Sequence, residues 1–283
     1  MKEIRGAGIQ SLGVFMPREQ DPEMSTLLKV ENLTVTFGAQ SVLRDISLEI
    51  APGETLAVIG ESGCGKTVLL KNLIGLIRPT SGRIFFEGVD IGTLNEAELA
   101  ETRKNYGFVF QMAALFDSMT IEENLLFPLV QHTKLPRQEM MERILRLLDE
   151  VGLSTNVLPK RPAELSGGMR KRVGIARALV LQPKIVLYDE PTTGLDPIMT
   201  DVINRLMAHM ARTYEITSVI VTHDMTTVRN VADRVVMLYP TARLKRNEPQ
   251  ILFNGPAKTI ERSRDPRIRD FVFGDGSSRL KEK

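Results

Sequence analysis

Along the first third of the chain, short runs of alternating or continuous apolar residues predict β-strands. Four such runs occupy residues 28–37, 42–50, 55–59 and 83–86. β-branched and aromatic residues with a two-residue period, bounded by glycine, favour a pleated and partly buried backbone. We therefore expect these runs to be strands, most of them antiparallel.

The middle of the chain changes to a helical period. Residues 67–76 follow a glycine turn and predict a helix, and from residue 96 to about 182 apolar positions recur mostly at helical spacing. Two helices are expected at 137–151 and 167–181, whereas residues 107–110 predict a strand. In the first helix, one face collects Met140, Ile144, Leu147, Leu148 and Val151. This stretch predicts a helical subdomain inserted at about 96–182.

The second half of the chain alternates between strands and helices. Three apolar runs at 185–188, 218–221 and 235–238 are separated by helical segments such as 197–213. This alternation is typical of a parallel sheet with crossover helices. The predicted fold class is α/β, with a mostly parallel core sheet, an antiparallel β subdomain and an inserted helical subdomain.

Composition and charge narrow the picture. The chain has 283 residues, 42% hydrophobic and 25% charged, with one cysteine, so an intramolecular disulfide is excluded. No apolar run is long enough for a transmembrane helix. Residues from 241 onward contain 11 Lys/Arg and 6 Asp/Glu, a charge of +5, which leaves −3 on the remainder. Because only the tail is basic, no nucleic-acid partner is expected.

We divide the chain into an N-terminal extension (1–26), a main domain (27–255) and a basic tail (256–283).

The strongest chemical signal is a glycine-rich loop between a predicted strand and a predicted helix. The loop consists of Gly60, Glu61, Ser62, Gly63, Cys64, Gly65, Lys66 and Thr67. It matches the phosphate loop G-x-x-x-x-G-K-[ST] in its required context, which disfavours a chance glycine turn. Backbone amides and the helix N-terminus would cradle phosphates, with Lys66 on the β- and γ-phosphates and the Thr67 hydroxyl on Mg²⁺.

Three other predicted strands end in polar residues. Asp189 and Glu190 follow the strand at 185–188, and His223 follows the strand at 218–221. Carboxyl ends of parallel strands share one edge of a sheet, where ligands bind. We assign Asp189 to Mg²⁺, Glu190 to activation of an attacking water as general base, and His223 to the γ-phosphate. Gln111, after the strand at 107–110, could reach Mg²⁺ and the water, although spacing alone does not decide this.

A second glycine-containing motif precedes a predicted helix. Ser166 is a good N-cap, and Gly167 and Gly168 leave the backbone open to an anion. Arg170, Lys171 and Arg172 follow in the first turn, where cations oppose the helix dipole. This arrangement hints that a phosphate approaches, although an ordinary capped helix explains it equally well.

Together these motifs resemble an ATPase subunit of the ABC type. In chain order they are the loop at 60–67, Gln111, the segment 165–169, the strand and acids at 185–190, Gly194-Leu195-Asp196, and His223. The resemblance covers roughly 28–239. It implies a head-to-tail homodimer in which Ser166, Gly167 and Gly168 of one copy complete the ATP site of the other, with Asp196 at the junction. Phe37 matches the aromatic residue that stacks on adenine.

Finer similarities favour one subfamily. Residues 111–120, 122–124, 127–129, 222–225 and 265–271 resemble the ATPase of MCE-linked phospholipid transporters. That resemblance implies a separate integral membrane permease, an MCE-domain lipid-binding protein, and a peripheral location on the cytoplasmic face of the inner membrane. Amino-acid importers share much of the pattern, and a non-transport ABC ATPase is a third alternative. The cargo and the direction of transport are not encoded in these residues.

Three features near the end of the chain and in the loop stay open. Residues 239–249 depart from the family pattern and are interpreted as a local insertion without an assigned function. Residues 255–267 resemble the usual family ending, a helix after the phrase at 253–256, and the segment beyond can grip the partner protomer. Cys64, near a helix N-terminus, could carry a thiol of lowered pKa, although a packed and unreactive thiol is the simpler interpretation.

Overall fold

Two β-sheets organise the part of the chain that the computed structural model describes, residues 26–276. The smaller sheet is antiparallel and has the strand order β2-β1-β4-β5. Its strands are β1 (Leu28–Phe37), β2 (Gln40–Ile50), β4 (Ser81–Phe86) and β5 (Val89–Asp90). Alternating burial along β1 confirms that one face of this sheet packs on a core. Residues 1–25, most of the predicted N-terminal extension, lie outside the described residues.

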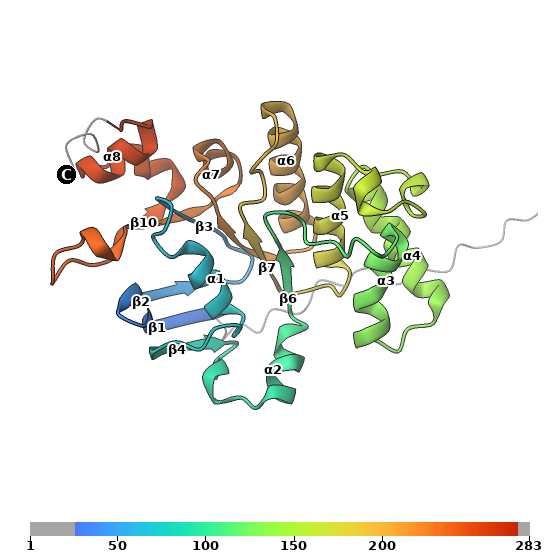
Figure 1. The fold of residues 1–283 in the computed structure, drawn as a ribbon, viewed down its shortest axis with the longest axis horizontal. Coiled ribbons are helices and arrows are strands. Elements are labelled where there is room, and N and C mark those ends of the chain that lie inside the picture. Colours follow the sequence, from blue (N-terminus) through green and yellow to red (C-terminus); the bar gives the residue numbers. More distant parts are fainter. Residues whose placement is uncertain (1–25, 277–283) are drawn as a thin grey trace, which may run out of the picture.

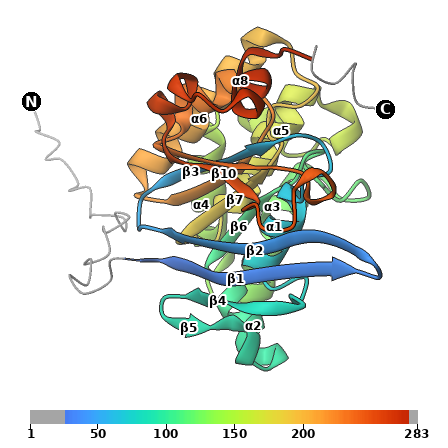
Figure 2. The ribbon, with the colours of Figure 1, turned by 90° about the vertical axis from the view of Figure 1, so that its left-hand side faces the viewer.

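The larger sheet is mostly parallel and has the strand order β10-β9-β3-β8-β7-β6 (Figures 1 and 2). Its strands are β3 (Thr55–Gly60), β6 (Tyr106–Val109), β7 (Ile185–Asp189), β8 (Thr217–Val221), β9 (Arg234–Leu238) and β10 (Ile251–Pro256). Only β10, at one edge, is antiparallel to its neighbour. Every residue of β3, β7 and β8 is buried, as expected for strands covered on both faces. The predicted α/β class is confirmed.

Helices cover the larger sheet and form a lobe beside it. They are α1 (Lys66–Leu73), α2 (Glu96–Arg103), α3 (Ile121–His132), α4 (Arg137–Glu150), α5 (Gly167–Leu179), α6 (Pro197–Thr213), α7 (Met225–Val231) and α8 (Pro266–Phe273). Residues 26–276 also contain five 3₁₀ turns between these elements: η1 (Ile91–Thr93), η2 (Thr155–Val157), η3 (Pro162–Glu164), η4 (Thr241–Arg243) and η5 (Ala257–Arg262). Figure 1 shows α3 and α4 gathered on the far side of α5 from the sheet. Among the described residues, no helix has the length and apolar character needed to span a bilayer.

Local signals explain where individual helices begin. Asp196 caps α6 by accepting a hydrogen bond from the Met199 amide at 2.9 Å, and Pro197 occupies the first helical position. The helix predicted at 197–213 has the same bounds as α6. The helix predicted from residue 67 ends three residues early, at Leu73, and the one predicted at 167–181 ends at Leu179.

The stretch 96–182 is not helical throughout. Strand β6 lies within it and pairs with β7 in the larger sheet. Gly107 lets α5 lie close against β6, because a Cβ there would lie 2.6 Å from the Ala178 carbonyl oxygen of α5. The core of the lobe beyond this strand includes Leu125, Ile144 and Val173 and is continuous with Val186 of β7 and Ile203 of α6.

The C-terminal segment returns to the larger sheet. After β10, residues 257–262 form the 3₁₀ turn η5 rather than an α-helix, and α8 follows. Ile268 and Val272 of α8 are buried against Val228 of α7 and Ile260 of η5. The family-like ending thus contains its α-helix later than predicted.

Candidate functional site

A solvent-open cleft of about 760 Å³ lies at the carboxyl edge of the larger sheet. Small-molecule sites typically span ~300–1,000 Å³. The predicted residues that line it are Phe37, Gly60, Glu61, Ser62, Gly63, Gly65, Lys66, Thr67, Gln111, Glu190 and His223. They come from the ends of β1, β3, β6, β7 and β8 and the start of α1. Parallel pairing in the larger sheet therefore brings together residues up to 163 positions apart, from Gly60 to His223, and Phe37 joins them from the smaller sheet.

The phosphate loop has a backbone that only glycine accommodates easily. Gly60 has φ 142°, and a Cβ there would lie 2.2 Å from the Leu238 carbonyl oxygen. Gly65, at φ 100°, directly precedes α1, and its Cβ would lie 2.7 Å from a Leu43 methyl carbon. Both positions combine a left-handed backbone with close neighbours, so the loop can curl without obstruction. The first amides of α1 then point toward an incoming anion.

Lys66 is held at the centre of this loop. Its Nζ donates to the Gly60 and Glu61 carbonyl oxygens at 2.7 and 3.0 Å. The residue is only 8% exposed. The ammonium is therefore a preorganised cation in a concave, amide-lined loop, suited to phosphate oxygens.

Thr67 and Asp189 form the oxygen pair expected for a magnesium site. The Thr67 hydroxyl donates to Asp189 Oδ1 at 3.0 Å, and Asp189 is 9% exposed. Burial raises the pKa of the Asp189 carboxyl, and the hydrogen bond from Thr67 opposes that rise. No cluster of three or more His, Cys, Asp or Glu side chains within 26–276 could hold a metal by itself. This oxygen pair fits Mg²⁺, which usually takes one or two protein ligands together with substrate phosphates and water.

Glu190 and His223 contact each other at the mouth of the cleft. His223 Nδ1 lies 2.8 Å from Glu190 Oε2, and Thr193 Oγ1 donates to the same oxygen at 3.1 Å. The Glu190 backbone is left-handed, with φ 49°, and its amide donates to the Val221 carbonyl at 2.9 Å. This turn aims the carboxylate away from its strand, where a general base can meet a water.

Gln111 is placed by a lysine from the helical lobe. Lys171 Nζ donates to the Gln111 carbonyl at 2.5 Å and lies 3.4 Å from the Glu190 carbonyl. Burial lowers the pKa of Lys171, although Glu190 partly offsets the effect. Lys171 therefore ties the Gln111 turn to the turn that carries Glu190. Arg170 and Arg172 similarly donate to the Leu165 and Gly152 carbonyls. These hydrogen bonds give the three cations a structural role, and a phosphate approaching this helix stays a prediction.

The structure does not bring every predicted site residue into this cleft. Ser166 caps α5, accepting from the Met169 amide at 3.3 Å, and Asp196 caps α6. These residues, with Gly167 and Gly168, are absent from the lining of the cleft of their own chain. Their action on the ATP site of another copy stays a prediction.

The suggestion that the Cys64 thiol has a lowered pKa is wrong, and the simpler interpretation of a packed thiol is confirmed. Its side chain is 1% exposed and packs in the core shared by the two sheets. Burial raises the pKa of the thiol, so the helix N-terminus does not make it reactive. Only the backbone of Cys64 belongs to the loop.

Two contributors to the cleft were missed by sequence reasoning. Phe271 of α8 and Val42 of β2 also line it. Phe271 lies in the segment 265–271 that resembles the subfamily, but that resemblance does not place it at the cleft, which it reaches through the packing of α8 in the C-terminal cluster.

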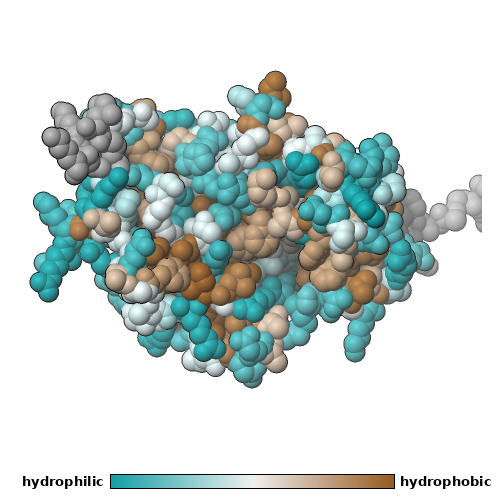
Figure 3. All heavy atoms as spheres, in the orientation of Figure 1, coloured by the Kyte–Doolittle hydropathy of each residue, from teal (hydrophilic) through white to brown (hydrophobic). Residues whose placement is uncertain are grey.

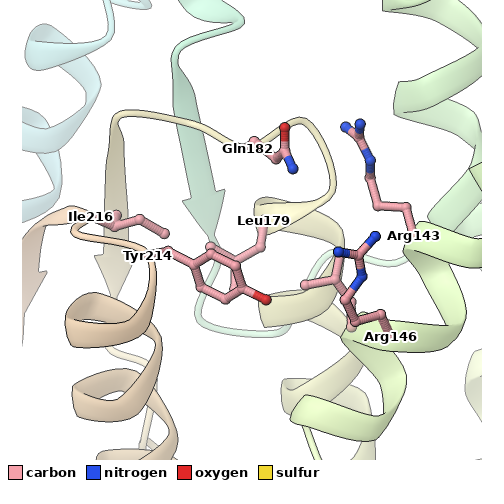
Figure 4. Close-up of a pocket in the computed structure, with 7 residues that line it drawn as sticks. Arg143, Arg146, Leu179, Gln182, Tyr214 and Ile216 are labelled. Atoms are coloured by element: carbon pink, nitrogen blue, oxygen red, sulfur yellow. The ribbon is translucent and has the colours of Figure 1, made fainter. Parts of the chain in front are cut away.

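A second hollow lies between α4, the end of α5 and the turn before β8 (Figure 4). It is lined by Arg143, Arg146, Leu147, Leu179, Gln182, Tyr214 and Ile216. Its volume of about 20 Å³ suits roughly one water molecule. Arg143 donates to the Val180 carbonyl, and the Tyr214 hydroxyl donates to Glu150. These contacts indicate a structural feature rather than a ligand site.

Comparisons with known proteins agree with the geometry. A family model described as "ABC transporter" matches residues 43–193. The Mycobacterium leprae protein named probable ribonucleotide transport ATP-binding protein mkl is 40% identical over 251 residues, covering 89% of this chain and 70% of that protein. The Haemophilus influenzae protein named intermembrane phospholipid transport system ATP-binding protein MlaF is 36% identical over 257 residues, covering 90% and 94%.

Solved structures share the fold over most of the chain. Clostridium perfringens cbiO1, described as part of an ABC transporter complex, matches with a TM-score of 0.74 and 31% identity, over 90% of this chain and 96% of that one. A dimeric ATP-binding cassette, MJ0796, bound to ADP and Pi, matches with a TM-score of 0.69 and 31% identity, over 80% and 100%. The chain therefore belongs to the ABC transporter family and is an ATPase of that family.

Proposed function

We propose that this ATPase drives phospholipid transport between membranes, together with a separate integral membrane permease and an MCE-domain lipid-binding protein. In this proposal it sits peripherally at the cytoplasmic face of the inner membrane. The MlaF-named relatives match over nearly their full length and support a lipid cargo. The observation that carries the motor assignment is that the ATP cleft and an exposed apolar groove meet at one segment, residues 110–111.

The proposed motor is a head-to-tail homodimer. Ser166, Gly167 and Gly168 at the start of α5 would face the γ-phosphate of the partner's ATP, and Asp196 would lie at the junction. Ile198 beside Asp196 is 79% exposed, an unusual position for isoleucine on a free surface. ATP would then close two shared sites, and hydrolysis through Glu190 would reopen them.

The groove next to the cleft is the proposed permease dock. It is lined by Ala100, Arg103, Lys104, Tyr106, Gly107, Phe108, Phe110, Phe127, Pro128, His132, Arg177, Ala178 and Leu181. Phe110 and Phe127 are 38% and 37% exposed. Figure 3 shows this face hollowed between β6 and the helices α3 and α5, with apolar residues on both sides. An apolar helix of a partner fits such a groove. Because Phe110 in the groove directly precedes Gln111 in the cleft, a change at the ATP site can move the docked helix.

Phe127→Asp is expected to abolish co-purification of the permease while leaving ATP binding within about twofold. The substitution removes an aromatic ring from the contact area and puts a carboxylate where the apolar partner helix would have to cover it. Val130→Asp is the matched control, because Val130 lies on the same helix, is 57% exposed and does not line the groove. Equal permease recovery with both variants would contradict the proposed dock.

Deletion of residues 264–283 is expected to weaken the ATP-bound homodimer, because the tail is proposed to grip the partner. The matched control, deletion of 277–283, retains α8 and should dimerise normally. Both deletions are made in the Glu190→Gln variant, and analytical ultracentrifugation measures the mass of each ATP-bound dimer. An unchanged dimer after the longer deletion would refute the tail's role.

Purification of the complex through its native permease, followed by mass spectrometry of bound lipid, tests the cargo. Phospholipid and an MCE-domain protein are expected. Recovery of a binding protein for small solutes would support the importer alternative, and absence of any membrane protein would support a non-transport ATPase.

A further inference from the structure

The segment between β9 and β10, residues 239–250, contacts the ATP-binding loop directly. It leaves the sheet at Leu238, whose carbonyl oxygen adjoins Gly60, the first residue of the phosphate loop. It contains the short turn η4 and returns through Gln250 into β10. Thr241 Oγ1 donates to the Ser41 carbonyl at 2.5 Å, so the segment also touches the start of β2, just beyond Phe37.

Gln250 is buried between the phosphate loop and β2. Its Nε2 donates to the carbonyl oxygens of Cys64 and Val42, both at 3.0 Å. Its Oε1 accepts from the Arg44 amide at 2.7 Å. The residue is only 1% exposed. One side chain thus joins the loop that would hold phosphates to the strand that follows the adenine-stacking residue, and its amide donors are both used.

Arg243 adds a charge contact with the loop itself. Its Nη1 lies 2.6 Å from Glu61 Oε2, and the two side chains are 38% and 20% exposed. Glu61 is the second residue of the phosphate loop, so its carboxylate would repel the phosphates of an incoming nucleotide. A nearby guanidinium offsets that repulsion.

The segment is itself anchored on both sides. Arg44 Nη2 donates to the Lys245 and Glu248 carbonyls at 3.1 and 2.6 Å. Arg267 of α8 lies 3.6 Å from Glu248 and stacks over the Tyr239 ring at 5.2 Å. These contacts fix the backbone that presents Arg243 and Gln250 to the loop.

We propose that residues 239–250 are an ATP-affinity element in which Gln250 and Arg243 are positioning residues for the phosphate loop. Gln250 holds the loop at a set distance from β2, and Arg243 neutralises Glu61. Neither side chain lines the cleft. Their loss therefore weakens ATP binding and leaves the chemical step at Glu190 intact. The proposal rests on the loop being the ATP site, which a Lys66 variant tests separately.

Arg243→Ala is expected to raise the Kd for Mg-ATP about threefold, a typical size for a partly exposed ion pair, with kcat within twofold of the native value. Arg246→Ala removes the same charge three residues away, at an exposed position, and should leave the Kd unchanged. Arg243→Lys should restore most of the affinity. In a Glu61→Gln background, Arg243→Ala should have no further effect on the Kd.

Gln250→Leu is expected to raise the Kd about tenfold, because it leaves two buried carbonyl oxygens without their donor. Fluorescence titration with an ATP analogue measures Kd, and phosphate release measures KM and kcat. Equal Kd values for Arg243→Ala and Arg246→Ala, or a fall in kcat without a rise in KM, would overturn the proposal. If Gln250→Leu does not fold, the Arg243 series decides alone. If Lys66→Met also binds ATP normally, the result contradicts the assignment of the loop as the ATP site and not the role of residues 239–250.

Discussion

Glu190→Gln is expected to bind ATP as the native chain does and to hydrolyse it about 10²–10⁴-fold more slowly. The amide keeps the shape of the side chain and can still accept from Thr193, which lies 3.1 Å away. It cannot take a proton from an attacking water at any ordinary pH. The substitution therefore removes the proposed base without removing the loop that binds phosphate.

Single-turnover phosphate release and an ATP-binding titration separate these two effects. Glu164→Gln, at an exposed position in η3, makes the same chemical change away from the cleft and should hydrolyse ATP normally. The ATP-bound homodimer should accumulate only in the Glu190 variant. Turnover like that of the native chain would refute Glu190 as the base.

Lys66→Met is expected to raise the Kd for Mg-ATP by roughly 10- to 150-fold. The side chain keeps its approximate length but loses the ammonium that the Gly60 and Glu61 carbonyls hold in place. Charge-assisted hydrogen bonds contribute about 1.5–3 kcal/mol each, which corresponds to that range of affinity.

Lys71→Met provides the control, because Lys71 is an exposed residue in the last turn of the same helix. It should bind ATP within about threefold of the native chain. Isothermal titration calorimetry on both variants makes the comparison, and a melting curve verifies the fold of each. Equal affinities would show that the loop does not bind ATP through Lys66.

Elements with strong local signals were predictable from sequence. β3, β7 and β8 are continuous apolar runs, and α6 carries both its capping aspartate and a proline at its first position. The cleft was predictable for the same reason. Its polar residues stand at strand ends, and parallel pairing brings such ends to one edge.

Features that depend on contacts across the chain were not predictable. Gln250 joins Cys64 over 186 positions, and Arg44 joins Glu248 over 204, without any periodic pattern. For Cys64 the sequence left a reactive thiol open beside the simpler packed one, because a position near a helix N-terminus does not reveal that the thiol faces the core. The carbonyl partners of Lys171, Arg170 and Arg172, which lie on Gln111, Leu165 and Gly152, were likewise not evident from the sequence.

The most direct test of the central claim reconstitutes this ATPase with the permease and the MCE-domain protein proposed as its partners and follows a labelled phospholipid between two vesicle populations. Transfer is expected to require Mg-ATP and to fall to background with Glu190→Gln, while Glu164→Gln transfers normally. ATP hydrolysis by the native complex without any ATP-dependent phospholipid transfer would contradict the proposal that this chain powers lipid transport.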